Sequence, residues 1–255
     1  MLDIDPVESV SIGSWLAREG VERGLRTGRI WLHRDALCYS GANLLPVNLD
    51  AASARAFAEI AMLERRRCSS IVGRLPATDD LWRALEPQWG PARAVRHRQL
   101  VMVSNGDPQI PHDPRVRHAV DSDLEQFYEA SIRMYVEEIG TSPIVHDGGV
   151  AYRHRVWQLI REGLAFVRID AGEVVFKAEL GAVTPRCAQL QGVWVHPDLR
   201  GQGMGTAAIA SVLQLARTAG MSTISLAVND YNAAAVQAYL RCGFEVTGAQ
   251  MVVLF

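Results

Sequence analysis

A glycine-rich turn between an apolar segment and a long helical run limits the fold of this chain more than any other stretch. Residues 193–195 are predicted to end a buried strand, and Pro197 cannot continue it because proline has no amide donor. The turn at 200–205, RGQGMG, then leads into the uninterrupted helical run 206–219. Glycines let a backbone approach a ligand closely, and the free amides and dipole of a helix N-terminus favour phosphate. The stretch therefore predicts a strand, a turn and a helix that together cradle a phosphate group.

The spacing of the glycines argues against two common nucleotide sites. A dinucleotide fingerprint needs G-x-G-x-x-G and an acidic residue about 20 positions further on. Here the spacing is R-G-x-G-x-G, and residues 220–225 contain no acid. A nucleotide P-loop needs G-K-[ST], whereas the one lysine of the chain is Lys177. The turn is therefore expected to bind another phosphate-bearing ligand.

The stretch 193–205 reads V-x-V-x-P-x-x-R-G-x-G-x-G and resembles motif A of the GNAT acetyltransferase superfamily. A second stretch, 232–244, has the N-x-x-A-x-x-x-Y-x-x-x-G-F spacing of that family's other signature. Two signatures in the family's order and at its distance are far more specific than either alone. The resemblance covers residues 115–255, and the arrangement as a whole also resembles bacterial members with an extra N-terminal domain.

The resemblance implies that acetyl-CoA is the cosubstrate and that no metal takes part. In the family, acetyl-CoA lies in a V between two parallel strands, which here are 187–195 and 222–228. Backbone groups of the first strand would bind the pantetheine amides and polarise the thioester, and the loop amides would hold the pyrophosphate. The residues implied to bind acetyl-CoA are Val193, Val195, Arg200, Gly201, Gln202, Gly203, Met204, Gly205, Thr206 and Asn232.

Tyr239 is the implied general acid. It lies two turns into the helix that Asn232 begins and would point toward the thioester sulfur. A phenol with a pKa of about 10 can protonate a departing thiolate while it is itself neutral. The alternative is that Tyr239 is a core aromatic residue packed against Phe244.

The general base is less clearly marked in the sequence. Many family members carry a Glu on the central strand, but the inward positions here are Gln189 and Gln191, which cannot accept a proton. Glu179 on the neighbouring strand is the nearest carboxylate by topology, although it could instead pair with Lys177. A missing strand carboxylate favours an acceptor amine of low pKa, since an α-amine costs about 1 kcal/mol to deprotonate at pH 7 and a lysine amine about 4.6.

Two further carboxylates follow each other on a helix that borders the acceptor groove in the family's fold. Glu137 and Glu138 could attract a cationic amine, or they could be an ordinary solvated pair. The sequence leaves both alternatives open.

The predicted elements of the second half follow the family's order, β-αα-βββ-α-β-α-ββ. They are a strand at 116–120, helices at 121–138 and 148–162, strands at 165–169, 174–183 and 187–195, a helix at 206–219, a strand at 221–228, a helix at 232–241 and closing strands within 245–255. The resemblance and this order predict a mixed α/β fold with a GNAT domain over residues 115–255.

The first half is predicted to be a separate α/β domain over residues 1–110, with the boundary in the Pro-, Asp- and Gly-rich stretch 104–114. Its predicted elements are a helix at 9–19, strands at 29–33 and 36–40, a loop at 41–48, a helix at 51–65, a strand at 70–72, a helix capped by Asp79 or Asp80 that ends before Pro87, and a strand at 96–103. This order of strands and helices matches the order predicted for residues 174–254. We interpret the first half either as a degenerate GNAT half-copy without the phosphate loop or as an unrelated small domain.

Composition limits the remaining function classes. A net charge of −2 gives no general attraction to nucleic acid. The four cysteines are far apart and form no C-x-x-C pair, which is typical of reduced thiols and not of zinc ligands. There is no apolar run of about 20 residues, and the acidic start of the chain is unlike a signal peptide. We therefore expect a cytoplasmic monomer or dimer that binds neither nucleic acid nor membrane.

The function predicted from the sequence is an N-acetyltransferase that moves an acetyl group from acetyl-CoA to a primary amine of a small molecule or peptide. The alternative is a catalytically weak acyl-CoA sensor that acts through its N-terminal domain. Measured turnover on an amine separates the two, because a sensor would bind the thioester without consuming it.

Overall fold

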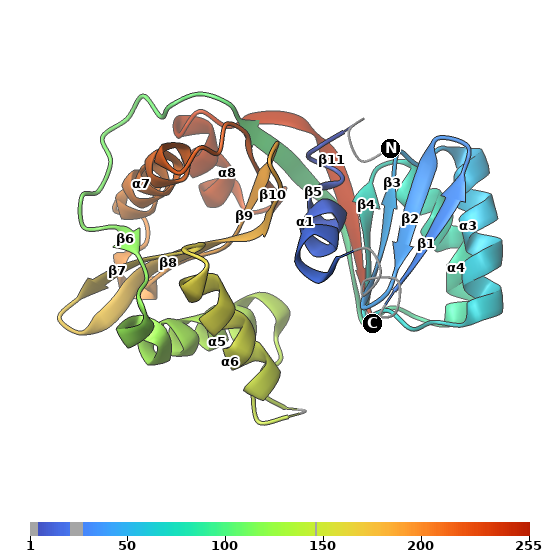
Figure 1. The fold of residues 1–255 in the computed structure, drawn as a ribbon, viewed down its shortest axis with the longest axis horizontal. Helices are drawn as coiled ribbons and strands as arrows, with labels where there is room; N and C mark the ends of the chain where they lie inside the picture. The colour runs from blue at the N-terminus through green and yellow to red at the C-terminus, as the bar shows by residue number, and fades with distance from the viewer. Residues whose placement is uncertain (1–4, 21–27, 146) are drawn as a thin grey trace.

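The computed structural model describes residues 5–20, 28–145 and 147–255 (Figure 1). The strands are β1 (Arg29–His33), β2 (Ala36–Ser40), β3 (Asn43–Val47), β4 (Ser70–Arg74), β5 (Ala94–Ser104), β6 (Arg117–His118), β7 (Ala165–Asp170), β8 (Glu173–Val183), β9 (Ala188–Val195), β10 (Ile224–Asn229) and β11 (Glu245–Leu254). They form one sheet in the order β1-β2-β3-β4-β11-β5-β10-β9-β8-β7-β6. The pairs β3–β4 and β9–β10 are parallel, whereas the others are antiparallel. The predicted mixed α/β class is confirmed.

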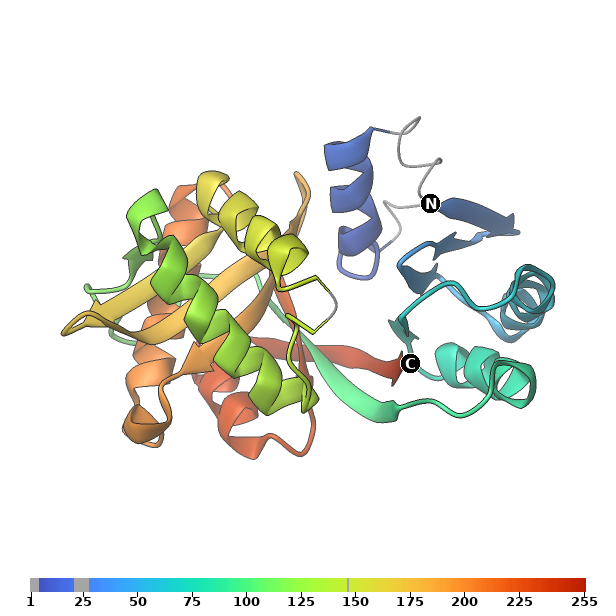
Figure 2. The same ribbon diagram turned by 90° about the horizontal axis from the view of Figure 1, so that it is seen from below.

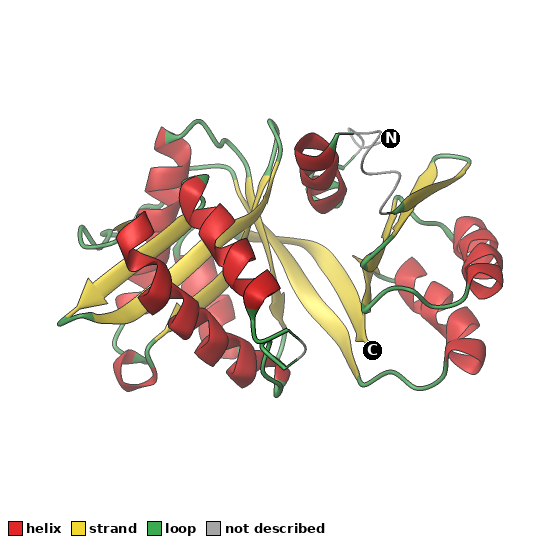
Figure 3. Ribbon diagram, turned by 60° about the horizontal axis from the view of Figure 1, so that its bottom comes forward, coloured by secondary structure: helices red, strands yellow, loops and turns green. Residues whose placement is uncertain are grey.

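The helices cover the two ends of this sheet separately (Figures 1 and 2). They are α1 (Val10–Glu19), α3 (Ala51–Glu64), α4 (Ala77–Trp89), α5 (Leu124–Ile139), α6 (Val150–Arg161), α7 (Met204–Thr218) and α8 (Ala233–Arg241), with single turns η1 (Asp121–Asp123) and η2 (Pro197–Leu199). In the C-terminal half, α5 and α6 lie on one face of the sheet and α7 and α8 on the other (Figure 3). In the N-terminal half, α3 and α4 pack together beside β1 and β4.

The two halves repeat one topology. The order β1-β2-β3-α3-β4-α4-β5 in the first half matches β7-β8-β9-α7-β10-α8-β11 in the second. The last strand of each half pairs with the other half, since β5 lies between β11 and β10, and β11 lies between β4 and β5. Figure 1 shows β5 and β11 running side by side between the two groups of helices.

The two hydrophobic cores reflect this exchange of strands. The core of the C-terminal half contains Met102 from β5, and the core of the N-terminal half contains Met251 and Val253 from β11. Each half therefore completes its core with a strand that belongs, in sequence order, to the other half.

Three predicted elements differ from the structure. The loop predicted at 41–48 contains β3, and Pro46 is tolerated there because β3 has already separated from β4, to which it pairs only at Asn43 and Leu44. The helix predicted to start at Asp79 or Asp80 begins at Ala77 and continues through Pro87, which lies in its last turn. The predicted closing strands are the single strand β11, because β5 occupies the neighbouring place in the sheet.

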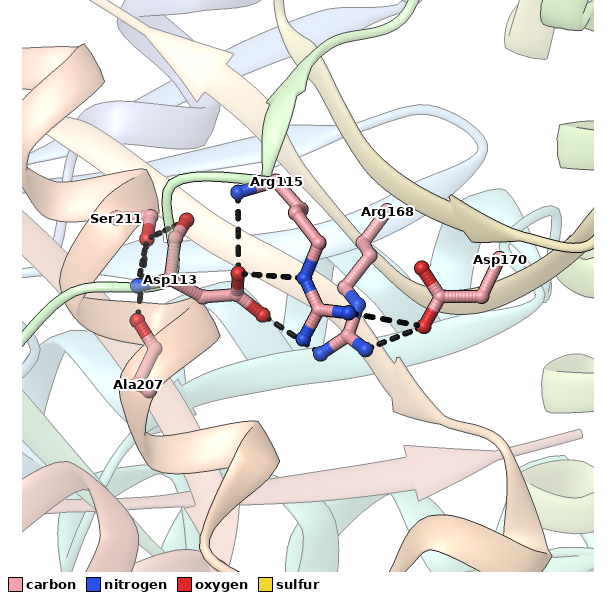
Figure 4. A network of polar contacts seen from close by, with 6 residues as sticks. All are labelled: Asp113, Arg115, Arg168, Asp170, Ala207 and Ser211. Atoms are coloured by element: carbon pink, nitrogen blue, oxygen red, sulfur yellow. Dashed lines mark hydrogen bonds and ion pairs between the residues drawn. The ribbon is translucent and has the colours of Figure 1, made fainter.

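The predicted boundary stretch is anchored to the C-terminal half (Figure 4). The Asp113 carboxylate accepts from Arg168 on β7 at 2.7 Å, and Arg168 also pairs with Asp170. The Asp113 N–H donates to the hydroxyl of Ser211 on α7 at 2.8 Å. The two halves share one sheet, and this stretch is bonded to the C-terminal half. The division into domains at residues 1–110 and 115–255 therefore remains a proposal from the sequence.

Candidate functional site

The strands β9 and β10 separate soon after they meet. They pair only at Ala188 with Ile224 and at Gln189 with Ser225. Further along, β9 carries a bulge at Gly192, whose φ of +59° suits glycine. The bulge leaves two residues of β9 opposite one residue of β8, and such bulges bend a strand and redirect its polar groups. The result is an open V between two parallel strands, as the resemblance implied.

The backbone of Val195 faces into this V. His196 donates its N–H to the Val175 carbonyl on β8 at 2.9 Å. Because successive backbone groups of a strand point to opposite sides, the N–H of Val195 points away from β8, toward the gap. The Val195 carbonyl already accepts from Arg200 Nε at 2.9 Å.

The turn before α7 ends in an open helix N-terminus. Gly201 and Gly203 have φ of +75° and +80°, a region that other residues enter only with strain, and Gly203 is the N-cap. No side chain caps this helix, and a Cβ added at Gly201 or Gly203 would meet no described atom within 4 Å. The first-turn amides therefore face open space at the positive end of the helix dipole.

The matching place in the N-terminal half is closed. Only three residues, 48–50, join β3 to α3, and the Asp50 carboxylate caps that helix by accepting from the Ser53 N–H at 2.7 Å. The gap between β3 and β4 is filled, because a Cβ on Gly73 would lie 2.5 Å from Thr78 Oγ1 and 2.7 Å from Pro46 Cγ. A helix end already bound to its own carboxylate does not offer those amides to a phosphate.

A groove of about 950 Å³ runs from the turn before α7 through the V to α5. Ten of the twelve predicted site residues line it: Glu179, Val193, Val195, Arg200, Gly201, Gly203, Gly205, Thr206, Asn232 and Tyr239. The other two do not. The Gln202 amide donates to the Asp198 carbonyl at 3.0 Å, and Met204 packs against the C-terminal core.

The sequence left open whether Tyr239 faces the site or packs in the core, and the structure shows that it does both. Its ring packs edge-on against Phe244 with the centroids 5.6 Å apart, and it also lines the groove. Among the described residues, no hydrogen-bond partner is found for its hydroxyl. Burial raises the pKa of Tyr239 well above its usual value, so the phenol keeps its proton at neutral pH.

Glu179 lies against the bulge of β9. A Cβ on Gly192 would come within 3.1 Å of the Glu179 carboxyl group. The carboxylate accepts from Gln191 Nε2 at 3.0 Å and from Lys177 Nζ at 3.3 Å, and Lys177 is fully buried. The anticipated ion pair with Lys177 is therefore present, and it holds the carboxylate beside the point where β9 and β10 separate.

The carboxylates of α5 are already paired. Glu137 accepts from Arg200 Nη2 at 2.6 Å and from Trp194 Nε1 at 3.2 Å, and Glu138 pairs with Arg96 at 2.8 Å. Both carboxylates are exposed to solvent, as one alternative expected, but each is also paired with an arginine, so neither has its charge free for an amine. Glu137 instead directs the Arg200 guanidinium toward α5, a role that sequence spacing did not reveal.

Two polar residues of α6 were also missed. The Tyr152 hydroxyl donates to the Ser131 carbonyl at 3.2 Å and lines the groove, and Arg155 Nη2 donates to the Gly181 carbonyl at 2.7 Å. The sequence held a signal for Arg155. It lies three residues after Tyr152 and four before Leu159, which puts it on the apolar face of the helix. A cation on such a face needs a partner.

None of the helices within the described ranges is long and apolar enough to cross a membrane. In the same ranges, no group of three or more His, Cys, Asp or Glu side chains is arranged to hold a metal ion. All four cysteines are buried and unpaired.

Comparison with known families divides the chain near residue 125. Residues 28–127 match a family described as a domain of unknown function (DUF4081). Residues 124–244 match the acetyltransferase (GNAT) family.

Solved structures share the whole arrangement of both halves. An acetyltransferase of the GNAT family from Colwellia psychrerythraea superposes with a TM-score of 0.59 at 16% identity, covering 98% of this chain and 93% of its own. A GCN5-related N-acetyltransferase from Kribbella flavida gives 0.57 at 17% identity, with 96% and 95% covered. At these identities the likeness establishes the fold.

Curated relatives match shorter segments. An L-methionine sulfoximine/L-methionine sulfone acetyltransferase of Pseudomonas aeruginosa is 33% identical over 82 residues, which are 31% of this chain and 48% of the relative. A thialysine N-epsilon-acetyltransferase of Mus musculus is 43% identical over 56 residues, 22% of this chain and 33% of the relative. The chain thus spans about half or less of the length of these relatives.

Proposed function

We propose that this chain, whose residues 124–244 form a GNAT acetyltransferase domain, transfers the acetyl group of acetyl-CoA to a primary amine. The observation that carries the proposal is that the open N-terminus of α7 faces a groove that also contains a carboxylate. This carboxylate is Glu179 of β8, which lies against the bulge of β9. One end of this groove suits a pyrophosphate and the middle suits a thioester. The names of the two curated relatives describe acetylation of amino-acid derivatives, which supports an amine acceptor.

The loop before α7 binds the pyrophosphate in this proposal. Its glycines keep side chains out of the anion's place, and the amides at the positive end of the helix dipole donate to it. The Val195 N–H binds a pantetheine carbonyl, and Asn232 lies where the pantetheine arm passes. Arg200, held by Glu137, keeps the turn in position and adds a positive charge nearby.

Glu179 acts as the general base. The incoming amine must lose a proton as its nitrogen forms the new bond to the acetyl carbon, and Glu179 accepts that proton directly or through one water. Gln191 and Lys177 orient the carboxylate toward the bulge. In this proposal the base is the carboxylate that the sequence indicated as nearest to the two glutamines of the central strand.

Tyr239 acts as the general acid. When the carbon–sulfur bond breaks, the departing thiolate takes the phenolic proton, so the products are the acetylated amine and the free thiol of CoA. Burial keeps the phenol protonated until that step, because its pKa is raised above the usual value.

The test is a thiol-release assay with the full chain, acetyl-CoA and a panel of primary amines, with the acetylated product identified by mass spectrometry. Turnover on at least one amine, with product formed in equal amount to free CoA, is the expected result. Tight binding of acetyl-CoA without turnover on any amine would overturn the proposal in favour of an acyl-CoA sensor.

A further inference from the structure

A second cavity, of about 590 Å³, lies beside the groove and has no role in the proposed transfer. It is open to solvent on one side and is lined by residues of α1, α6, β8 and β9 and by Glu162, which follows α6. Gln191 lines both this cavity and the groove, so the two hollows share one wall. Its charged and amide-bearing residues are Arg18, Arg155, Gln158, Glu162, Gln189 and Gln191.

One wall of this cavity comes from the N-terminal half of the chain. The Ser14 hydroxyl on α1 accepts from the Val183 N–H at 3.0 Å, and Arg18 pairs with Glu162 of α6 at 2.8 Å. Figure 1 shows α1 between the two groups of helices, beside the C-terminal sheet. The extra domain therefore closes a space next to the catalytic groove.

Arg155 is the cation of this cavity that lacks an anionic partner. Its guanidinium donates a hydrogen bond to the Gly181 carbonyl, and within the described residues no carboxylate forms an ion pair with it. Burial, and then the nearby charge of Arg18, lower the pKa of Arg155, while the charges of Glu179 and Glu162 oppose them without forming an ion pair, and the guanidinium remains charged. A half-buried cation that no carboxylate contacts directly is stabilised further by a ligand that supplies a negative charge.

The side chain of Gln191 lies between the cavity and the groove. The Gln191 amide lies over Gly181, since a Cβ added there would come within 1.9 Å of it. The same amide donates to Glu179 at 3.0 Å, and the charge of Glu179 is close enough to act on Arg155. Glu179, Gln191 and Arg155 thus form a continuous row from the bulge of β9 into the cavity.

From this row we propose that the second cavity binds a carboxylate of the acceptor, so that the substrate is an amine that also carries a carboxylate group, such as an amino acid. The inference rests on the proposed acetyl transfer. Arg155 presents planar paired donors that match a carboxylate, whereas the charge of Arg18 is already paired with Glu162. The amine then lies at Glu179 and the carboxylate beyond Gln191.

The test uses the reaction product, which binds without reacting. N-acetyl amino acids with short and long side chains, and the corresponding N-acetyl amino-acid amides, are titrated by calorimetry into the full chain saturated with CoA. The acids should bind about 10–100-fold more tightly than the amides, as expected for charge-assisted hydrogen bonds. Arg155→Gln should abolish this difference, and Arg155→Lys should keep part of it.

The matched control is Arg153→Gln. Arg153 lies on the exposed side of the same helix, paired with Glu125, so this variant removes the same charge without touching the cavity. It should bind the acids as the unmodified chain does. Thermal melts of all variants verify that each is folded.

Equal binding of acids and amides, or a preference that survives Arg155→Gln, would overturn the carboxylate site. Turnover restricted to amines without a carboxylate would overturn it too, while leaving the acetyltransferase proposal intact. Conversely, carboxylate-dependent binding that Arg155→Gln removes would support the site even if no amine were turned over, and only the proposed transfer would then fail.

Discussion

Glu179 shows how a single carboxylate gains a defined position from its neighbours. Lys177, on the same face of β8, donates to one oxygen, and Gln191 from β9 donates to the other. With both oxygens held, the carboxylate has few alternative orientations, which is what a positioned base requires.

Replacing Glu179 with Gln should lower kcat at pH 7 by about 10²–10⁴-fold, because the amide keeps the size but cannot accept a proton. The deficit should shrink as pH rises past the pKa of the acceptor amine, about 7.7 for an α-amine and 10.4 for a lysine amine, since the amine then arrives deprotonated. A profile of kcat against pH measures this. Glu173→Gln, at the exposed start of the same strand, should change nothing, and an equal loss at all pH values would contradict the role of base.

Tyr239→Phe retains the ring and its contact with Phe244 but removes the proton. If the phenol protonates the departing thiolate, kcat should fall by about 10²–10⁴-fold while the affinity for acetyl-CoA hardly changes. Because burial raises the pKa of Tyr239, its deprotonation should not limit activity below about pH 10. Steady-state kinetics and calorimetry on one preparation check both points, and near-normal turnover would make Tyr239 a packing residue.

At this scale the sequence predicted those residues whose role follows from spacing along one stretch. The glycines, Asn232 and Tyr239 lie in two continuous signatures, and they line one groove in the structure. The ion pair of Glu179 with Lys177 was anticipated, but the contacts of Glu179 with Gln191 and of Arg155 with Gly181 form between different elements, so spacing in one stretch could not supply them. The pairing of Glu137 with Arg200 was missed for the same reason, because the two residues are 63 positions apart.

At the scale of elements, the connection between β5 and β6 depends on one carboxylate. Asp113 is buried and holds Arg168 on β7 together with the backbone of α7 (Figure 4). Burial alone would raise the pKa of Asp113, but the Arg115 N–H and the Arg168 guanidinium outweigh it and keep the pKa below its usual range. The ionised form is thus the one that the folded chain stabilises.

Asp113→Asn should lower the free energy of unfolding at pH 7 by about 2–3 kcal/mol. This is less than the cost of breaking a buried ion pair completely, because Arg168 retains its ion pair with Asp170. An aspartate with a lowered folded pKa contributes stability above its unfolded pKa of about 3.9 and loses it as pH falls through the folded value. The difference between variant and unmodified chain should therefore close below about pH 4. Denaturant unfolding across pH measures it, and Asp107→Asn, in an exposed pair with Arg217, serves as control.

The elements that sequence reasoning misjudged are those decided by tertiary context. β3 contains Pro46 and resembled a loop, but it survives as a strand because β2 pairs with it along its length while β4 has already diverged. α4 includes Pro87 in its last turn, where the ring removes one hydrogen bond and crowds the preceding turn, and the buried residues Leu81, Trp82 and Leu85 all lie before it. Periodicity located the other described helices and strands to within a few residues.

At the scale of the molecule, the repeated topology was visible in the sequence but the exchange of last strands was not. Element order is a property of the chain, whereas the neighbours of β5 and β11 depend on strand pairing between the two halves. The exchange makes the halves interdependent, which sequence-based domain boundaries do not convey.

Two fragments test this interdependence. A fragment from residue 93 to 255 keeps β5 between β10 and β11, whereas a fragment from 114 to 255 leaves both strands with unpaired edges and removes Met102 from the core. The shorter fragment should aggregate, because it exposes strand edges and apolar surface, and the longer one should be more soluble and bind acetyl-CoA. Size-exclusion chromatography and circular dichroism compare them, and equal behaviour would show that the shared strand is dispensable.

Calorimetric titration of acetyl-CoA into the full chain tests most directly whether the groove before α7 is the one acyl-CoA site. One equivalent should bind per chain, since the matching place in the N-terminal half is closed by Asp50, Pro46 and Thr78. Gly203→Val should weaken binding at least 10-fold, because it strains a residue at positive φ and puts a side chain where the pyrophosphate lies. Gly220→Val, with equal strain at the far end of α7, should bind normally. Two equivalents per chain, or unchanged affinity in Gly203→Val, would contradict the account.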